Sequence, residues 1–168
     1  MTRVLVVSDT HARAADVAAV VERLQPHLAD IDHILHAGDA VCPELLDALA
    51  GFAPLDAVAG NMDPPALQAS LPERTVVELA GRRIGLIHGW GPGADLPRRV
   101  LERFCDPSGR PEVDALVFGH SHRPLHEYRH GTMLLNPGSA TQRRSAPFCS
   151  AARLDLGRHL QAHILRLD

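Results

Sequence analysis

The sequence predicts an α/β fold in which two mixed β-sheets face each other and helices flank them. Strand and helix patterns alternate over residues 3–59, which predicts a parallel sheet with right-handed crossovers. Short strands joined by hairpin turns dominate the second half, and these add antiparallel pairs. Because no repeat or long linker divides the chain, we expect residues 1–168 to form a single domain, large enough to bury a core without disulfides.

The first-half elements follow from hydrophobic periodicity and from helix start and stop signals. Val17, Val20, Val21 and Leu24 have the spacing of an amphipathic helix, while Pro43 and Gly51 suit the start and the end of another helix. In order, we expect a strand at 3–7, a helix at 14–28, a strand at 33–36, a helix at 43–50, a strand at 55–59 and then a loop to residue 65.

The second half reads as strands separated by turn residues, with one helix among them. In order, we expect strands at 75–79 and 83–87, a helix at 96–104, and strands at 115–118, 125–129, 132–135, 151–155 and 159–166. Ala80-Gly81-Arg82 and Leu156-Gly157-Arg158 supply two of the hairpin turns.

Composition excludes several function classes. The formal net charge is −3 and the pI is near 6.4, so there is no basic footprint and we expect no stable nucleic-acid partner. The apolar run at 3–7 is too short for a signal sequence or a membrane span. Three widely spaced cysteines, Cys42, Cys105 and Cys149, form no disulfide pattern, so we expect a cytoplasmic protein without a membrane association.

Polar residues with metal-binding chemistry follow five of the predicted strands. The runs are Val7-Ser8-Asp9, Ala37-Gly38-Asp39, Ala59-Gly60-Asn61, Leu86-Ile87-His88 and Phe118-Gly119-His120. Since the carboxyl ends of strands form the ligand crevice of α/β sheets, we expect these groups, with His11 and His122, to lie together. This mixture of oxygen and nitrogen donors suits Mn, Fe, Zn, Ni or Co. It is too large for one ion, so a shared carboxylate holding two ions about 3.5–4 Å apart is expected.

The ordered motifs resemble those of the calcineurin-like metallophosphoesterase superfamily. The matching segments are Asp9-Thr10-His11, Gly38-Asp39, Gly60-Asn61-Met62-Asp63, His88, Gly119-His120-Ser121-His122 and Asn136-Pro137-Gly138-Ser139. The compact size resembles the small bacterial and archaeal phosphodiesterase branch, which shares its fold with a eukaryotic retromer scaffold subunit. The resemblance implies a four-layer αββα sandwich and a small phosphoester as substrate.

The resemblance also implies a role for each side chain. Asp9, His11 and His122 would hold one metal ion, Asn61, His88 and His120 would hold the other, and Asp39 would bridge them. Two divalent transition-metal ions, with Mn²⁺ favoured, would then activate a bridging hydroxide for in-line attack on phosphorus, and Asn61 would steady the charge. The expected catalytic residues are Asn61, Asp39, His120 and Asp63. Asp39 and Asn61 could also cap the helices that follow them.

One departure from the family pattern bears on the substrate. Many members carry a histidine directly after the Asn of the third motif, whereas this chain has Met62, which cannot donate a proton. This favours diesters or activated esters, with Asp63 as a replacement acid. A phosphomonoesterase or protein phosphatase, and a non-catalytic scaffold, remain alternatives, and formation of a homo-oligomer is left open. We expect Trp90 and the loops 90–97 and 107–112 to shape the substrate pocket.

Overall fold

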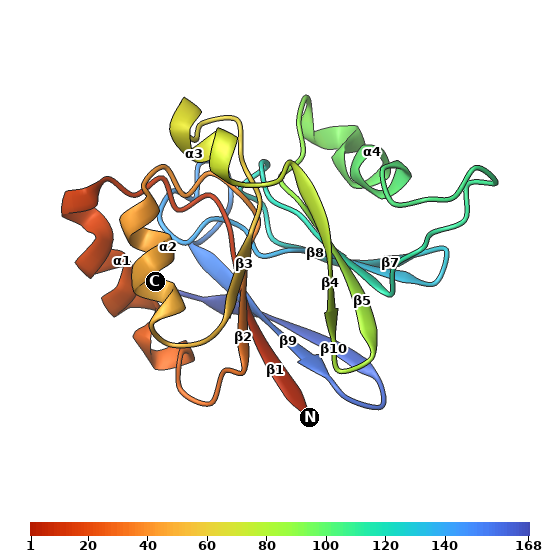
Figure 1. Cartoon of the computed structure of the whole chain (residues 1–168), viewed down its shortest axis with the longest axis horizontal. Coiled ribbons are helices and arrows are strands. Elements are labelled where there is room, and N and C mark those ends of the chain that lie inside the picture. Colours follow the sequence, from red (N-terminus) through yellow and green to blue (C-terminus); the bar gives the residue numbers. More distant parts are fainter.

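The computed structural model describes all residues, 1–168, and contains two five-stranded mixed sheets (Figure 1). The first sheet has the order β10-β9-β1-β2-β3 and the second the order β4-β5-β6-β8-β7. The strands are β1 (Thr2–Val7), β2 (His33–His36), β3 (Leu55–Ala57), β4 (Arg74–Leu79), β5 (Arg82–Ile87), β6 (Ala115–Val117), β7 (Leu125–Arg129), β8 (Thr132–Asn136), β9 (Ser150–Leu156) and β10 (Leu160–Arg166). Each sheet contains three adjacent parallel strands, β1-β2-β3 and β5-β6-β8. In the first sheet the antiparallel strands β9 and β10 extend the β1 side, and in the second sheet β4 and β7 flank the parallel strands on either side. The predicted fold class is confirmed.

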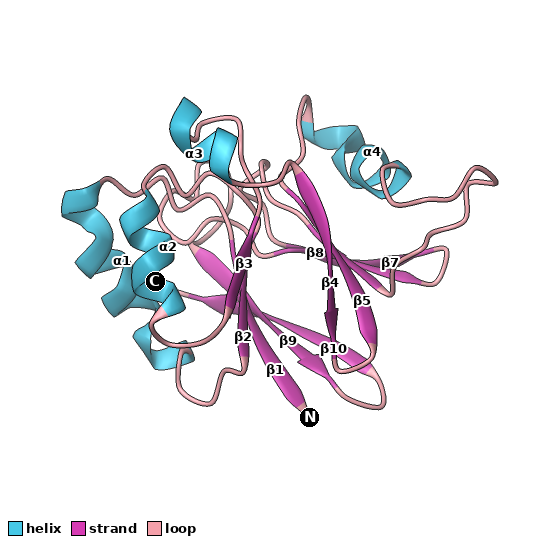
Figure 2. Cartoon of the chain, in the orientation of Figure 1, coloured by secondary structure: helices cyan, strands magenta, loops and turns pink.

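Helices cover the outer faces of both sheets, which completes the four-layer αββα order (Figure 2). The helices are α1 (Val17–Leu24), α2 (Pro43–Ala50), α3 (Pro65–Ser70) and α4 (Leu96–Glu102). Leu24 of α1 and Leu45 of α2 pack on Leu5 and Val7 of the first sheet. Val100 of α4 packs on Leu116 of the second sheet. Every helix falls short of the length and hydropathy that a bilayer-spanning segment requires.

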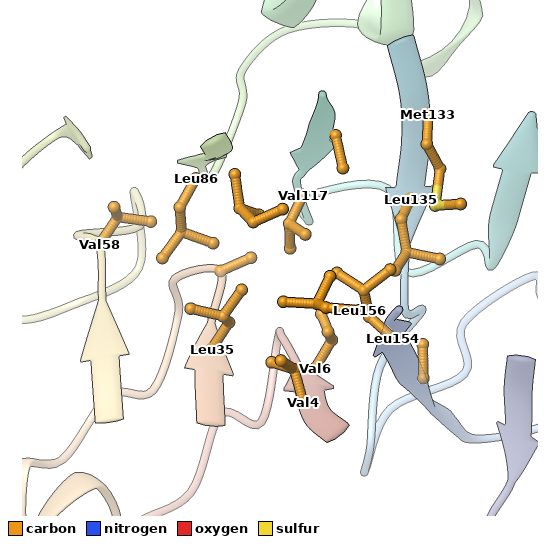
Figure 3. Packing of buried hydrophobic residues seen from close by; sticks show 14 residues of the cluster. Val4, Val6, Leu35, Val58, Leu86, Val117, Met133, Leu135, Leu154 and Leu156 are labelled. Carbon is orange, nitrogen blue, oxygen red and sulfur yellow. The ribbon is translucent and has the colours of Figure 1, made fainter. Parts of the chain in front are cut away.

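The central core lies between the two sheets (Figure 3). Val4 and Val6 of β1 point towards Leu86 of β5 and Val117 of β6, and all four are fully buried. Because successive side chains of a strand face opposite sides, the alternate residues of β1 enter the outer core with α1 and α2. Burial on both faces explains why these strands read as continuous apolar runs.

The structure differs from the predicted elements in several places; helix α4, for example, ends at Glu102 rather than at residue 104. The helix expected at 14–28 is α-helical only over α1, with 3₁₀ turns at Ala14–Asp16 and Gln25–His27, since Pro26 lacks the N–H that a continued helix needs. Strand β3 ends two residues early, because the N–H of Ala59 donates to the carbonyl of Pro72. Helix α3 was not predicted: Pro64-Pro65 reads as a loop, although proline suits the first turn of a helix.

Candidate metal centre

The loops after β1, β2, β3, β5 and β6 converge at one end of the sandwich and carry all seven predicted ligands. Backbone hydrogen bonds tie these loops together: the N–H of Asp9 donates to Gly38 O at 3.0 Å, and that of His11 to Asp39 O at 3.0 Å. Five of the seven residues have a left-handed backbone, which costs a non-glycine residue about 1–2 kcal/mol. Their φ values are 52° at Asp9, 42° at His11, 57° at Asp39, 69° at His120 and 57° at His122. Such clustered strain is typical of functional sites.

Asp9 carries a buried carboxylate oxygen that no hydrogen bond satisfies. The side chain is fully buried, and its Oδ2 accepts hydrogen bonds from Ser8 Oγ at 2.7 Å and from the N–H of His120 at 3.0 Å. Oδ1 has no hydrogen-bond partner and lies 3.2 Å from His122 Nε2. Burial raises the pKa of Asp9, but the neighbouring His122 and His88 outweigh burial and lower it. Asp9 is therefore ionised, and its Oδ1 is a buried acceptor without a hydrogen-bond donor.

Asp39 lies between the His11 and His88 sides of the cluster. Its Oδ1 accepts the N–H of Met62 at 2.7 Å, which leaves Oδ2 facing inwards. Oδ2 is 3.3 Å from His88 Nε2 and 3.7 Å from His11 Nε2. Burial raises the pKa of Asp39, but His88 and the Met62 N–H more than offset it, so this carboxylate is also ionised.

Three imidazoles are oriented by backbone carbonyls on their outer nitrogens. His88 Nδ1 donates to Ala37 O at 2.7 Å, His122 Nδ1 to Gln142 O at 2.5 Å and His120 Nε2 to Gly91 O at 3.1 Å. In the neutral rings this arrangement leaves the lone pair on the inner nitrogen. Metal-binding histidines have the same outer hydrogen bond, which sets the tautomer and the ring orientation.

The inner nitrogens, the carboxylate oxygens of Asp9 and Asp39 and the amide oxygen of Asn61 face one another at the middle of the site. His11 Nε2 is 3.2 Å from His122 Nε2, and Asn61 Oδ1 is 3.1 Å from both His88 Nε2 and His120 Nδ1. Two sets of three groups have their donor atoms within 4.8 Å of one another; they are Asp9, His11 and His122, and Asp9, Asp39 and His88. Asp9 belongs to both sets, so it shares the central position that was expected for Asp39 alone. The donors fit divalent transition-metal ions.

Glycines allow the ligand loops to approach each other closely. A methyl group at Gly60 would lie 2.1 Å from Asp39 Oδ1, and one at Gly38 would lie 2.7 Å from His88 Nδ1. Both distances are far below van der Waals contact. The glycine that precedes Asp39 and the one that precedes Asn61 are therefore required by packing against the site.

Asp63, the expected acid, faces the backbone. Its side chain is buried, and its Oδ2 accepts the N–H groups of Asp39 at 3.1 Å and Gly60 at 2.7 Å, while Oδ1 accepts that of Val41 at 2.7 Å. The carboxylate thereby joins the loop of Asp39 to the loop of Asn61. Its role as a proton donor stays a prediction, and the hydrogen bonds favour a positioning role.

Other groups support the centre, and only some of them carry a signal in the sequence. Gln142 orients His122 through its carbonyl, so its side chain carries no information about this role. Ser8 could have been found from its position beside Asp9. Ser139, in the 136–139 turn, donates to the carbonyl of Asp9 at 2.7 Å. His36 lies behind the site against Thr10 Oγ1, and burial lowers its pKa to about 4, so it is neutral.

Two cavities flank the centre. One, of 460 Å³, is lined by Asn61 and His88 together with Trp90, as expected for Trp90. The other, of 770 Å³, opens beside His120 and is lined by Gly91 and other residues of the loop 90–97. The loop 107–112 lines neither cavity, contrary to expectation, because it projects from the far side of α4 (Figure 1).

Comparison with known proteins establishes the family. The model of the calcineurin-like phosphoesterase superfamily domain matches residues 2–159. The chain is a member of that superfamily. A probable metallophosphoesterase of Methanothermobacter thermautotrophicus is 35% identical over 164 residues, which cover 96% of this chain and 90% of that protein. The resemblance seen in the sequence motifs is thus confirmed. Membership supports a phosphoesterase activity, and the family uses divalent metal ions.

Two solved structures share the whole fold of this chain. A predicted phosphoesterase of Streptococcus pneumoniae is 25% identical and superposes with a TM-score of 0.71, covering 99% of this chain and 90% of the other. Vps29 of Entamoeba histolytica, solved with Zn²⁺, is 23% identical with a TM-score of 0.71, covering 99% of this chain and 100% of the other. At that identity the likeness to Vps29 concerns the fold alone.

Proposed function

We propose that this superfamily member is a dinuclear metal-dependent phosphodiesterase. The observation that carries the proposal is the buried, ionised Asp9 Oδ1, which has no hydrogen-bond donor and faces the inner nitrogen of His122. A buried carboxylate oxygen without a hydrogen-bond donor is costly, whereas a bound cation would satisfy it. The three free cysteines support a reducing, cytoplasmic location.

The residues divide into two ligand sets around the carboxylates. Asp9, His11 and His122 would hold one ion, and Asn61, His88 and His120 the other, with Asp39 between them. The mixture of carboxylate, amide and imidazole donors supports Mn²⁺, with Fe, Ni, Zn and Co as alternatives. When bound, the ions would act as Lewis acids towards phosphoryl oxygens and lower the pKa of a coordinated water.

The chain itself contributes orientation and charge. Asn61 is exposed, and because its Oδ1 faces His88 and His120, its amide nitrogen is free to donate to a non-bridging phosphoryl oxygen. The carbonyls of Ala37, Gly91 and Gln142 hold the imidazoles in fixed directions. Phosphoryl transfer depends mainly on such positioning and charge neutralisation.

Two features support a diester substrate. Met62 is 56% exposed beside Asn61 and offers no proton to a leaving group, and Asp63 is occupied by three backbone N–H groups. A leaving group that departs without protonation is therefore preferred. The cavities on the two sides of the centre also provide room for two substituents on phosphorus.

The test is hydrolysis of an aryl phosphodiester by the metal-free protein after addition of Mn²⁺. We expect Mn²⁺-dependent activity that Asp39→Ala and His120→Ala abolish. His159→Ala, which changes an exposed residue in the β9–β10 turn, serves as the control and retains activity. A faster rate on the matching aryl monoester would favour the phosphomonoesterase alternative. Absence of both metal binding and hydrolysis across Mn²⁺, Zn²⁺, Ni²⁺, Co²⁺ and Fe²⁺ would contradict the proposal and favour a scaffold.

A further inference from the structure

The cavity beside His120 contains three arginines. Arg123, Arg129 and Arg144 line its wall together with His120, and Glu127 is its only acidic residue. Its volume of 770 Å³ is enough for a substituent of a phosphoester.

Only one of these arginines has a carboxylate partner. Arg129 Nε donates to Glu127 Oε1 at 2.5 Å. Arg123 donates to the hydroxyl of Ser145, from Nε at 3.2 Å and from a terminal nitrogen at 3.1 Å, and neither Arg123 nor Arg144 has a carboxylate within 4.0 Å. The cavity therefore retains two uncompensated positive charges, although the whole chain is acidic.

The cavity on the other side of the centre is electrically balanced. Its charged residues, Glu73 and Arg103, form an ion pair with each other at 3.2 Å. Arg103 also lies over the ring of Trp90, 5.6 Å from its centroid. The two sides of the metal centre thus differ in charge. A substrate that spans both should carry the complementary charge, negative on the side of the arginines and neutral on the other side.

The two arginines without a carboxylate partner lie close in sequence to residues of the centre. Arg123 directly follows His122. Arg144 lies two residues beyond Gln142, whose carbonyl accepts the hydrogen bond from His122 Nδ1. An anion held by these guanidinium groups would therefore lie close to the reacting phosphorus.

We propose that this arginine-lined cavity binds a second anionic group of the substrate, a phosphate or a carboxylate, on a substituent of the scissile phosphate. The inference rests on the proposed phosphodiesterase function and narrows its substrate class. Guanidinium groups match phosphate and carboxylate oxygens with paired, charge-assisted hydrogen bonds.

The experiment compares three p-nitrophenyl alkyl phosphodiesters whose short alkyl chains end in a hydroxyl, a carboxylate or a phosphate. With Mn²⁺ present, we expect kcat/KM for the better of the two anionic substrates to exceed that for the hydroxyl substrate about tenfold, the size of one charge-assisted hydrogen bond. The preference should shrink with added salt. The carboxylate and phosphate arms identify which anion the cavity prefers.

The double variant Arg123→Gln/Arg144→Gln should bring the ratio of kcat/KM between anionic and hydroxyl substrates close to one. Arg158→Gln, at an exposed position in the β9–β10 turn, is the matched control and should keep the wild-type ratio. If the double variant does not fold, Arg123→Lys alone should lower the ratio, because a lysine cannot make the paired contact. Equal rates on all three substrates, or a ratio that survives in the variant, would overturn the anion subsite. Failure to hydrolyse even the hydroxyl substrate would instead contradict the phosphodiesterase proposal.

Discussion

Replacing Asp63 with asparagine separates a positioning role from an acid role. The Asp63 carboxylate accepts three backbone N–H groups, two on Oδ2 and one on Oδ1. In Asp63→Asn an NH₂ group replaces one oxygen, so at least one buried N–H faces a donor. Hydrogen bonds to charged groups contribute about 1.5–3 kcal/mol each, so we expect unfolding to become easier by about 2–4 kcal/mol. For a chain of this size that corresponds to a Tm lower by roughly 5–15 °C.

The assay is thermal unfolding of the metal-free protein followed by circular dichroism, since bound metal would itself raise the Tm. Mn²⁺ affinity should also fall, because Asp63 holds the backbone of Asp39. Asp30→Asn is the control: its side chain is 82% exposed, 3.7 Å from Arg3, and its loss should cost less than about 0.5 kcal/mol. An unchanged Tm and Mn²⁺ affinity combined with lost hydrolysis would refute the positioning role and identify Asp63 as a proton donor.

Three other perturbations test the centre and its surroundings. Gly60→Ala should weaken Mn²⁺ binding at least about tenfold in calorimetry, because the added methyl group would displace Asp39. Gly157→Ala is the control and should leave Mn²⁺ binding unchanged, since a methyl group there would lie 3.7 Å from its nearest neighbour. Mn²⁺ affinity should fall as the pH drops, because the His88 ring must lose its proton to bind metal. Burial lowers the pKa of His88, but Asp39 and Asp9 more than offset burial and raise it above 6.5. A dissociation constant for Mn²⁺ that stays flat between about pH 8 and 6 would contradict this role of His88. His36 is neutral in the folded protein, where its pKa is about 4, against 6.5 when unfolded. Its contribution to the free energy of unfolding is therefore present above pH 6.5 and is lost as the pH falls towards 4. In urea unfolding, His36→Gln should remove about 3 kcal/mol of this loss of stability at acid pH.

The sequence predicted the architecture well where both faces of a strand are buried. The apolar runs that became β1, β2 and β6 place alternate residues in the inner and outer cores, so period and length identified them. The short α3 escaped prediction because two prolines open it and it has only one buried residue, Leu67. The break in the 14–28 helix at Pro26 was readable from the sequence and was missed.

The gathering of the seven candidate ligands was predictable because parallel strands present their carboxyl ends at the same edge of a sheet. The finer arrangement was not, since it depends on backbone geometry. The carbonyls that orient His88, His120 and His122 belong to Ala37, Gly91 and Gln142, and nothing in those side chains indicates the contact. The inward position of Asp63 and the gathering of Arg123 with Arg144 likewise follow from loop conformation, which sequence patterns do not specify.

Anomalous diffraction from a crystal grown with Mn²⁺ would test the metal centre most directly. We expect two manganese peaks, one contacted by Asp9, His11 and His122 and the other by Asn61, His88 and His120, with Asp39 between them. A map with no peak among these side chains, or with manganese held elsewhere on the chain, would contradict the dinuclear centre.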